Sequence, residues 1–89
     1  MSTYSLEVTF RGGRPTVAYL CVPRTLGDKS CRTKLAEPGL VIDINQKGKP
    51  IGVEILAPSK FTLRRLNSVL RQLGLPTVKR AEVAPLWGP

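Results

Sequence analysis

The sequence predicts an α+β fold, an antiparallel meander sheet of about 4–5 strands with one amphipathic C-terminal helix packed on one face. Short apolar segments of alternating polarity, separated by glycine and proline turns, indicate the strands. A single stretch with helical periodicity follows them. Because 89 residues support only one core, we expect a single α+β domain at 1–74 and an extended C-terminal tail at 75–89.

The first two expected strands form a hairpin. Residues 6–10, LEVTF, alternate apolar and polar side chains as a half-buried strand does. Gly12-Gly13 predicts the turn that follows. Residues 16–22, TVAYLCV, are apolar on both faces, so we expect a central strand that is covered on both sides. A polar connection is expected at 24–30.

A short third strand is expected at 31–35. Its other residues alternate with Arg32 and Lys34, so the sequence predicts an edge strand with an outward charged face. The sequence Glu37-Pro38-Gly39 predicts the turn that ends this strand.

The clearest hairpin signal consists of LVIDIN at 40–45 and IGVEIL at 51–56. Each segment places aliphatic residues on one face, and paired strands must turn these faces to the same side of the sheet. The loop should therefore have an even number of residues and turn through Lys47-Gly48, where glycine tolerates a positive φ. The expected pairs are Leu40 with Ile55, Ile42 with Val53 and Ile44 with Ile51.

A helix is expected at 59–73. Ser59 is a suitable N-cap, and Gly74 is a suitable residue to end the helix. The apolar residues recur at intervals of three and four, which predicts one buried stripe that faces the sheet. This stripe consists of Leu63, Leu66, Val69, Leu70 and Leu73. The opposite side is expected to carry Lys60, Arg64, Asn67, Ser68 and Arg71.

The strand at 16–22 needs a cover on its second face, because it is apolar on both. The tail at 75–89 or a symmetry-related copy could supply that cover, so the sequence predicts a tail-covered sheet or a homodimer. Tyr19 and Trp87 are the residues expected at such an interface, with Trp87 anchoring the tail to the body or to another chain.

Residues 33–60, TKLAEPGLVIDINQKGKPIGVEILAPSK, resemble the small prokaryotic family called domain of unknown function 2283. The resemblance covers about residues 6–60, and VAYLCV is similar to the tyrosine strand of the family, with Tyr19 at the place of its tyrosine. The matched positions in the hairpin region are Pro38, Gly39, Val41, Asp43, Gly48, Gly52, Glu54, Leu56 and Ser59.

The resemblance implies a small antiparallel sheet with a helix packed across it and no established catalytic residues. It also implies occasional gene pairing with toxin-like partners, and hence an antitoxin-like interaction role. Arg11, Arg14, Lys47 and Lys49 stand in regions where the family carries acidic residues, so the electrostatics of this chain are nearly inverted. A chain with a net charge of +8 would pair poorly with basic ribonuclease-type toxins.

The sequence contains no histidine, which removes the commonest general base and the imidazole metal ligand. Cys21 and Cys31 alone do not complete a zinc site, so we expect no metal, no cofactor and no catalytic residue. These thiols are interpreted as apolar fillers, or as a redox pair if their strands are adjacent. Without a signal-peptide pattern or an apolar stretch of membrane-spanning length, we expect a cytoplasmic protein with no membrane contact.

The net charge of +8 makes nucleic acid the first polyanion to consider. Lys60, Arg64, Arg65 and Arg71 could follow a phosphate backbone, although an amphipathic helix shows a charged outer face without any ligand. These four residues are the candidate anion-binding site.

A non-catalytic protein-interaction module with an unidentified protein partner is the leading functional hypothesis. The alternative is non-specific nucleic-acid binding through a basic surface. Asp43 and Glu54, expected on one sheet face about 7 Å apart, could also act as an acid–base pair or simply face solvent beside lysine and arginine. An enzyme that uses these two carboxylates is the third hypothesis.

Overall fold

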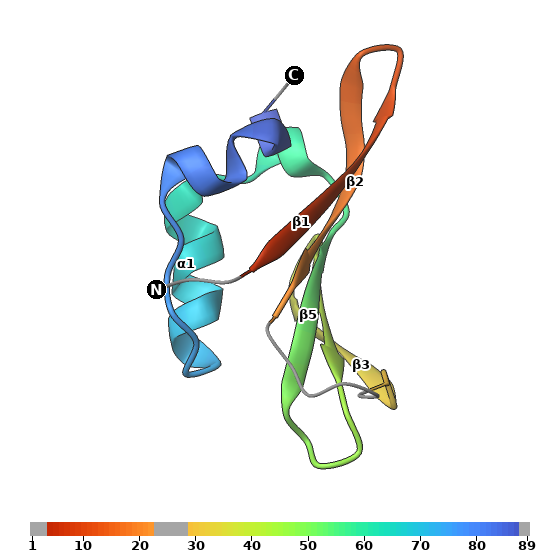
Figure 1. Cartoon of the computed structure of the whole chain (residues 1–89), viewed down its shortest axis with the longest axis vertical. Coiled ribbons are helices and arrows are strands. Elements are labelled where there is room, and N and C mark those ends of the chain that lie inside the picture. Colours follow the sequence, from red (N-terminus) through yellow and green to blue (C-terminus); the bar gives the residue numbers. More distant parts are fainter. Residues whose placement is uncertain (1–3, 23–28, 88–89) are drawn as a thin grey trace.

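Five antiparallel strands form one sheet, and the helical segments pack against one face of it (Figure 1). The computed structural model describes residues 4–22 and 29–87. The strands are β1 (Ser5–Arg11), β2 (Arg14–Cys21), β3 (Arg32–Glu37), β4 (Leu40–Ile44) and β5 (Pro50–Ile55). The helical segments are η1 (Pro58–Lys60), α1 (Leu63–Gln72) and η2 (Arg80–Trp87), of which η1 and η2 are 3-10 helices. The predicted α+β class is confirmed.

The strand order is β1-β2-β5-β4-β3, so two antiparallel units meet through β2 and β5. β1 and β2 form the first unit, a hairpin, and β3, β4 and β5 form the second unit, a meander. The last strand of the meander pairs with β2. β1 and β3 are therefore the two edges of the sheet, and the prediction of an edge strand after Cys31 is confirmed. The predicted connection at 24–30 falls largely outside the described residues.

The turn between β1 and β2 has the geometry that its two glycines permit. Gly12 and Gly13 have φ values of 60° and 78°, as both central residues of a type I′ turn require. Arg11 and Arg14 close the turn as a cross-strand pair. The predicted first hairpin is therefore confirmed.

The β4–β5 hairpin keeps the predicted register over most of its length. Leu40 lies opposite Ile55 and Ile42 lies opposite Val53, as predicted. The prediction for Ile44 is wrong, because the register shifts after Asp43 and Ile44 lies opposite Pro50.

The cause of this shift lies in the turn. The side-chain oxygen of Asn45 accepts hydrogen bonds from the N–H groups of Lys47 and Lys49, both at 2.9 Å. Gly48 has a φ of 81°, and the N–H of Asn45 donates to the carbonyl of Lys49 at 2.9 Å. Residues 46–48 thus form a three-residue loop, so the predicted even loop is wrong. A turn held by an asparagine side chain, followed by glycine with positive φ, introduces the extra residue that shifts the register.

The N-cap of the helix lies three residues later than predicted. Thr62, not Ser59, is the N-cap, and its hydroxyl accepts a hydrogen bond from the N–H of Arg65 at 3.2 Å. Phe61 has an extended backbone with φ of −101° and ψ of 147°, and its side chain is buried in the core. The burial of Phe61 therefore separates the short turn at Pro58–Lys60 from α1.

The C-terminal end of α1 agrees with the prediction. Gly74 has a φ of 74°, and the N–H of Leu75 donates to the carbonyl of Leu70 at 2.9 Å, as in a Schellman motif. The leucine stripe faces the sheet: Leu66, Val69 and Leu70 are buried in the core, and Leu63 and Leu73 pack at its border.

The predicted extended tail is wrong for Arg80–Trp87, which coils into η2, and residues 75–79 before it have no regular secondary structure. The tail returns along α1 after the reversal at Gly74 (Figure 1). Its apolar side chains join α1 and the strands in one core, with Val78, Val83 and Leu86 all buried. These side chains make the tail a part of the core rather than an appendage.

Two side chains hold the tail at its ends. The indole N–H of Trp87 donates to the carbonyl of Phe61 at 2.7 Å, so Trp87 anchors the tail to the body of its own chain. The hydroxyl of Tyr4 donates to the carbonyl of Pro76 at 2.6 Å. Burial, with a smaller contribution from Glu82, raises the pKa of Tyr4, so this hydroxyl keeps the proton that it donates.

The tail does not cover the second face of β2, so the predicted tail-covered sheet is wrong, and the predicted homodimer stays a prediction. The tail packs on the same side of the sheet as α1, because the reversal at Gly74 returns it along the helix. Val17, Tyr19 and Cys21 stay half-buried on the other side. Within the described residues, no helix is both long and apolar enough to cross a membrane.

Candidate interaction surfaces

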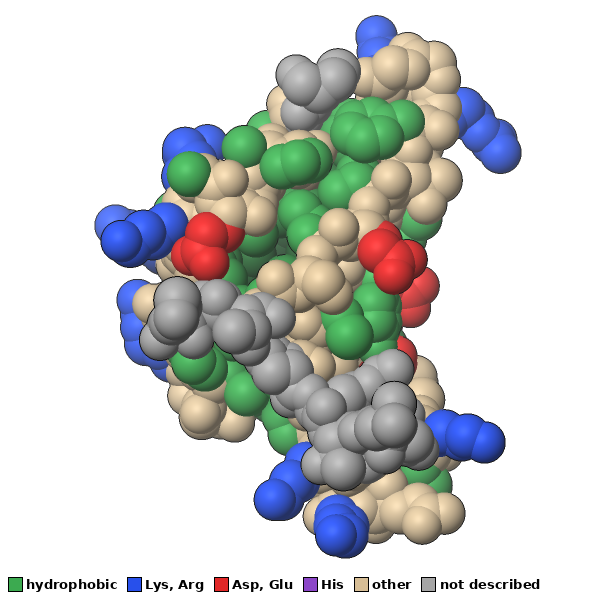
Figure 2. Space-filling view, in the orientation of Figure 1, with side chains coloured by type: hydrophobic (Ala, Val, Ile, Leu, Met, Phe, Trp, Pro, Cys, Tyr) green, Lys and Arg blue, Asp and Glu red, His purple; other side chains and the backbone are tan. Residues whose placement is uncertain are grey.

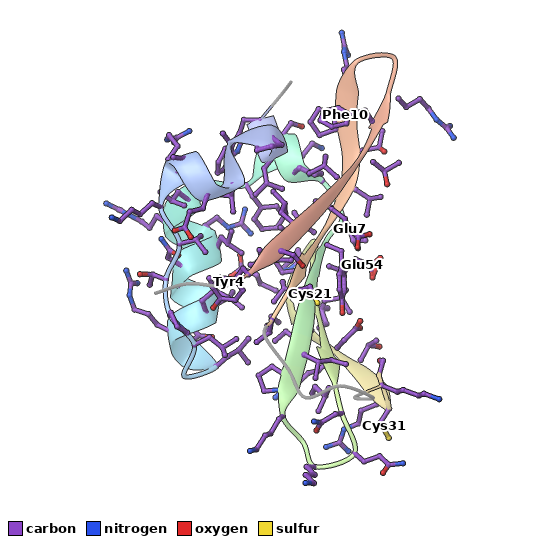
Figure 3. All side chains as sticks on the ribbon, in the orientation of Figure 1. Tyr4, Glu7, Phe10, Cys21, Cys31 and Glu54 are labelled. Atoms are coloured by element: carbon purple, nitrogen blue, oxygen red, sulfur yellow. The ribbon has the colours of Figure 1, made fainter. Side chains whose placement is uncertain are left out.

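The face of the sheet opposite α1 is called here the open face. By the pairing of the strands, it carries Ser5, Glu7, Thr9, Val17, Tyr19, Cys21, Thr33, Leu35, Val41, Asp43 and Glu54. Three of its residues are acidic, and Glu7 and Glu54 extend from it together in Figure 3. Of the other described carboxylates, Glu37 bonds Arg65, and Glu82 accepts from the N–H of Lys79. Acidic groups thus concentrate on the open face of a strongly basic chain.

Tyr19 lies at the centre of the open face, opposite Glu7 on β1 and Glu54 on β5. Its hydroxyl donates to Oδ2 of Asp43 at 2.9 Å, and its ring crosses over Gly52. A side chain at Gly52 would overlap the phenol, so close approach requires glycine at this position. Tyr19 also lines a shallow hollow of about 350 Å³ between the acidic residues.

We expect Gly52→Ala to lower the free energy of unfolding by about 1–3 kcal/mol, because the added methyl group displaces Tyr19 from Asp43. Chemical denaturation measures this loss. In a Tyr19→Ala background the same substitution should cost almost nothing, because the overlap is gone and alanine suits a strand better than glycine. An equal cost in both backgrounds would contradict the close approach.

Asp43 and Glu54 share one face, as predicted. Asp43 lies opposite Gly52 and Glu54 lies opposite Val41, so the two carboxylates are diagonal neighbours. The carboxylate of Asp43 accepts the Tyr19 hydroxyl and has a structural role there. Among the described residues, no three cysteine or carboxylate side chains gather as metal ligands would. Catalysis by this pair stays a hypothesis.

The four predicted anion-binding residues do not form one site. Arg65 donates from Nε to Glu37 at 2.8 Å and lies over the ring of Phe61 at 4.4 Å, so its charge is already paired. Lys60 lies in η1, before the extended residue that separates η1 from the helix. Arg64 and Arg71 are exposed and seven residues apart, so they share one side of α1.

The two cysteines are too far apart to form a disulfide. Cys21 ends β2, and Cys31 immediately precedes β3. β5 and β4 lie between these strands, so three strand spacings separate the thiols, about 14 Å. A disulfide needs Cα atoms within about 7 Å. Both thiols are free, and Figure 3 shows them at separate places on the sheet.

The β3 edge is the most exposed strand of the sheet. Every residue from Arg32 to Ala36 is exposed, and Leu35 has 63% of its surface accessible. Arg32 and Lys34 lie opposite Ile44 and Ile42 of β4, so their side chains are on the side of α1. Leu35 lies on the open face. In the described part of the chain, β3 pairs with β4 alone.

A cleft of about 340 Å³ lies beside β3, on the side of α1. Its lining includes Lys34 from β3, Ile42 and Ile44 from β4, and Gln72 and Leu73 from the end of the helical region. The 3-10 segments of the cover lie toward the other end of the sheet, because η1 and η2 pack against β2 and η2 also packs against β1.

Sequence reasoning missed both the cleft and the exposure of Leu35. The alternation of Arg32 and Lys34 with uncharged residues indicated an edge strand. It did not show which side of the sheet the charges would occupy, because that depends on the pairing of β3 with β4.

Comparison with known proteins gave no match: no protein-family description, curated protein or solved structure is significantly similar to this chain. The resemblance of residues 33–60 to the family named above stays a prediction.

Figure 2 shows how charge is distributed over one side of the molecule. Lysine and arginine side chains project from the outline at its top, bottom and left, and acidic side chains lie at mid-height on the left and the right. The basic residues of the β1–β2 and β4–β5 turns, Arg11, Arg14, Lys47 and Lys49, are all exposed. The candidate interaction surfaces therefore differ in charge: a basic β3 edge, an acidic open face and an outer side of α1 with Arg64 and Arg71.

Proposed function

We propose that this protein is a non-catalytic interaction module that binds an extended acidic segment of a partner protein along the edge of β3. The observation that carries this proposal is the exposed edge, with two cations on one side and Leu35 on the other. An unpaired edge is a template for an added strand, a recurring mode of peptide recognition.

The backbone of β3 is oriented for such an addition. The N–H of Leu56 donates to the carbonyl of Gly39 at 2.9 Å, and with the register of β4 and β5 this directs the backbone groups of Val41 and Asp43 toward β5. Backbone groups alternate in direction along a strand, so those of Ile42 and Ile44 point toward β3, where they lie opposite Lys34 and Arg32. The groups of Thr33 and Leu35 therefore point outward, and an added strand would form its hydrogen bonds with these two residues.

The side chains of β3 favour a particular sequence in the partner. Carboxylates opposite Arg32 and Lys34 would form attractive cross-strand pairs. A long acidic side chain would also enter the cleft, where its methylene groups can pack on Ile42 and Leu73 beside Lys34. An apolar residue on the other side would cover Leu35. The favoured partner segment thus alternates acidic and apolar residues.

We expect a synthetic peptide of alternating glutamate and valine to bind this protein more tightly than a peptide with lysine in place of glutamate. Fluorescence anisotropy with labelled peptides measures both dissociation constants. Arg32→Glu combined with Lys34→Glu should weaken binding of the acidic peptide at least about tenfold, because two attractive pairs become repulsive.

The matched control is Arg64→Glu combined with Arg71→Glu. It removes the same amount of positive charge from the exposed side of α1 and leaves β3 unchanged. Equal weakening by both double variants would mean that only the net charge attracts the peptide. Equal binding of the acidic and the lysine peptide would contradict the proposed site.

The second candidate function is non-specific binding of nucleic acid by the outer side of α1. It is favoured by the exposure of Arg64 and Arg71 and by the gathering of acidic residues on the opposite face. We expect affinity for a single-stranded oligonucleotide to fall steeply between about 50 and 200 mM salt if this candidate is correct. This candidate function also predicts that the Arg64 and Arg71 double variant loses more affinity for the oligonucleotide than the Arg32 and Lys34 double variant does.

A further inference from the structure

The second edge of the sheet, β1, differs from β3 in its chemistry. Glu7, Thr9 and Arg11 are exposed on the open-face side of β1, and Phe10 on the other side has 41% of its surface accessible. Figure 3 shows Phe10 and Glu7 on opposite sides of the strand. In the described part of the chain, β1 pairs with β2 alone. Figure 2 shows hydrophobic side chains gathered over this part of the surface.

The backbone direction along β1 can be assigned from two observations. The carbonyl of Thr9 accepts the Thr16 hydroxyl of β2 at 3.0 Å, so it points toward β2. Arg11 and Arg14 close the two-residue turn, which also directs the backbone groups of Arg11 toward β2. The N–H and C=O groups of Val8 and Phe10 therefore point outward at the edge.

A second copy of the same strand can satisfy these outward groups. Antiparallel pairing about a twofold axis at Thr9 places Val8 opposite Phe10 of the second copy, and these residues exchange backbone hydrogen bonds. The same register places Glu7 opposite Arg11 of the second copy. By symmetry the Val8–Phe10 and Glu7–Arg11 pairs each occur twice. The cross-strand contacts in this register are therefore apolar, Thr–Thr or of opposite charge.

Other registers and the other edge are less suited to self-pairing. A shift of the axis to Glu7 would place the two Glu7 carboxylates opposite each other. Self-pairing of β3 about Thr33 would place Arg32 opposite Lys34 of the second copy, and like charges opposite each other are destabilising. An axis at Val8 would also pair outward backbone groups, but it would place Glu7 opposite Thr9, so the register about Thr9 is the one that pairs opposite charges. The β3 register about Thr33, by contrast, repels a second copy.

We propose that two copies of this chain associate through antiparallel pairing of their β1 edges, which forms one continuous ten-stranded sheet. The strand pair is short, so the dimer is weak and its population depends on protein concentration. This proposal stands independently of the function assigned to β3, because the two edges lie at opposite ends of the sheet.

Sedimentation velocity from micromolar to near-millimolar concentration tests this association, with Glu7→Lys and Arg11→Glu as the variants. Each variant places like charges in both symmetric pairs, so we expect the dissociation constant of the dimer to rise at least about tenfold. When the two variants are mixed in equal amounts, a copy with Glu7→Lys can pair with a copy with Arg11→Glu. Both cross-strand pairs between positions 7 and 11 are then of opposite charge again. The mixture should therefore form heterodimers as tightly as the original chain forms homodimers.

The matched controls are Glu54→Lys on the open face and Lys47→Glu at the β4–β5 turn. Each makes the same change of charge away from β1 and should leave the dimer unchanged. Circular dichroism confirms that all four variants fold. The proposal is overturned by a monomer at every concentration, by a dimer that neither β1 variant weakens, or by failure of the mixture to associate.

Discussion

Leu86→Ala is expected to lower the free energy of unfolding by about 2–5 kcal/mol, although only three residues follow it in the sequence. The side chain of Leu86 is 1% exposed and packs in the same core as the leucines of α1. Its truncation would remove apolar contacts and leave a cavity between η2 and the sheet. Urea denaturation followed by circular dichroism measures the change.

Leu56→Ala is the matched control for this prediction. It deletes the same atoms from a leucine that is 48% exposed, so we expect a loss below about 1 kcal/mol. Similar losses for the two variants would mean that the tail is a detachable extension and not a part of the core. A chain that ends at Gly74 should for the same reason fail to fold cooperatively, because it lacks Val78, Val83 and Leu86.

Asn67→Leu is expected to destabilise the protein by about 2–4 kcal/mol, even though leucine is a better helix former and similar in size. Asn67 is buried, and its amide donates to the carbonyl of Val78 at 3.0 Å and accepts from the N–H of Val78 at 2.8 Å. The side-chain amide of Asn67 thus gives Val78 the two backbone hydrogen bonds that a neighbouring strand would otherwise supply. Leucine would leave both backbone groups buried without partners.

Hydrogen exchange separates this role from a general loss of stability. We expect the amide of Val78 to exchange faster in Asn67→Leu than the core amides of β5 do, because the tail is released from α1 first. Gln72→Leu serves as the control on the exposed side of the same helix and should change stability little. An unchanged exchange rate at Val78 would contradict the role of Asn67.

Asn67 also shows where helical periodicity stops being informative. The sequence predicted it on the solvent side of the helix beside Ser68, because it lies outside the leucine stripe. The structure buries it, because the tail returns along α1 and packs over that side. An asparagine between two apolar surfaces is indistinguishable in sequence from one that faces water. Only the path of residues 75–79 distinguishes them.

The candidate sites were predictable to different degrees. The shared face of Asp43 and Glu54 followed from the two-residue period of strands, which is a local property. The pairing of Arg65 with Glu37 did not, because those residues are 28 positions apart and meet only when α1 lies beside β3 and β4. Of the predicted group Lys60, Arg64, Arg65 and Arg71, the helical period therefore placed only Arg64 and Arg71 together on one exposed side of α1.

By itself the sequence determined the class of the fold, both hairpins, the leucine stripe and the end of α1 at Gly74. Each depends on a period or on a glycine with positive φ, and these act over a few residues. The tertiary structure alone decided that β5 pairs with β2, that the tail completes the core on the side of α1, and that β1 is the second edge. The physical reason is that these arrangements depend on which apolar faces meet across long separations in the chain, and many sequences with the same local periods could bury those faces differently.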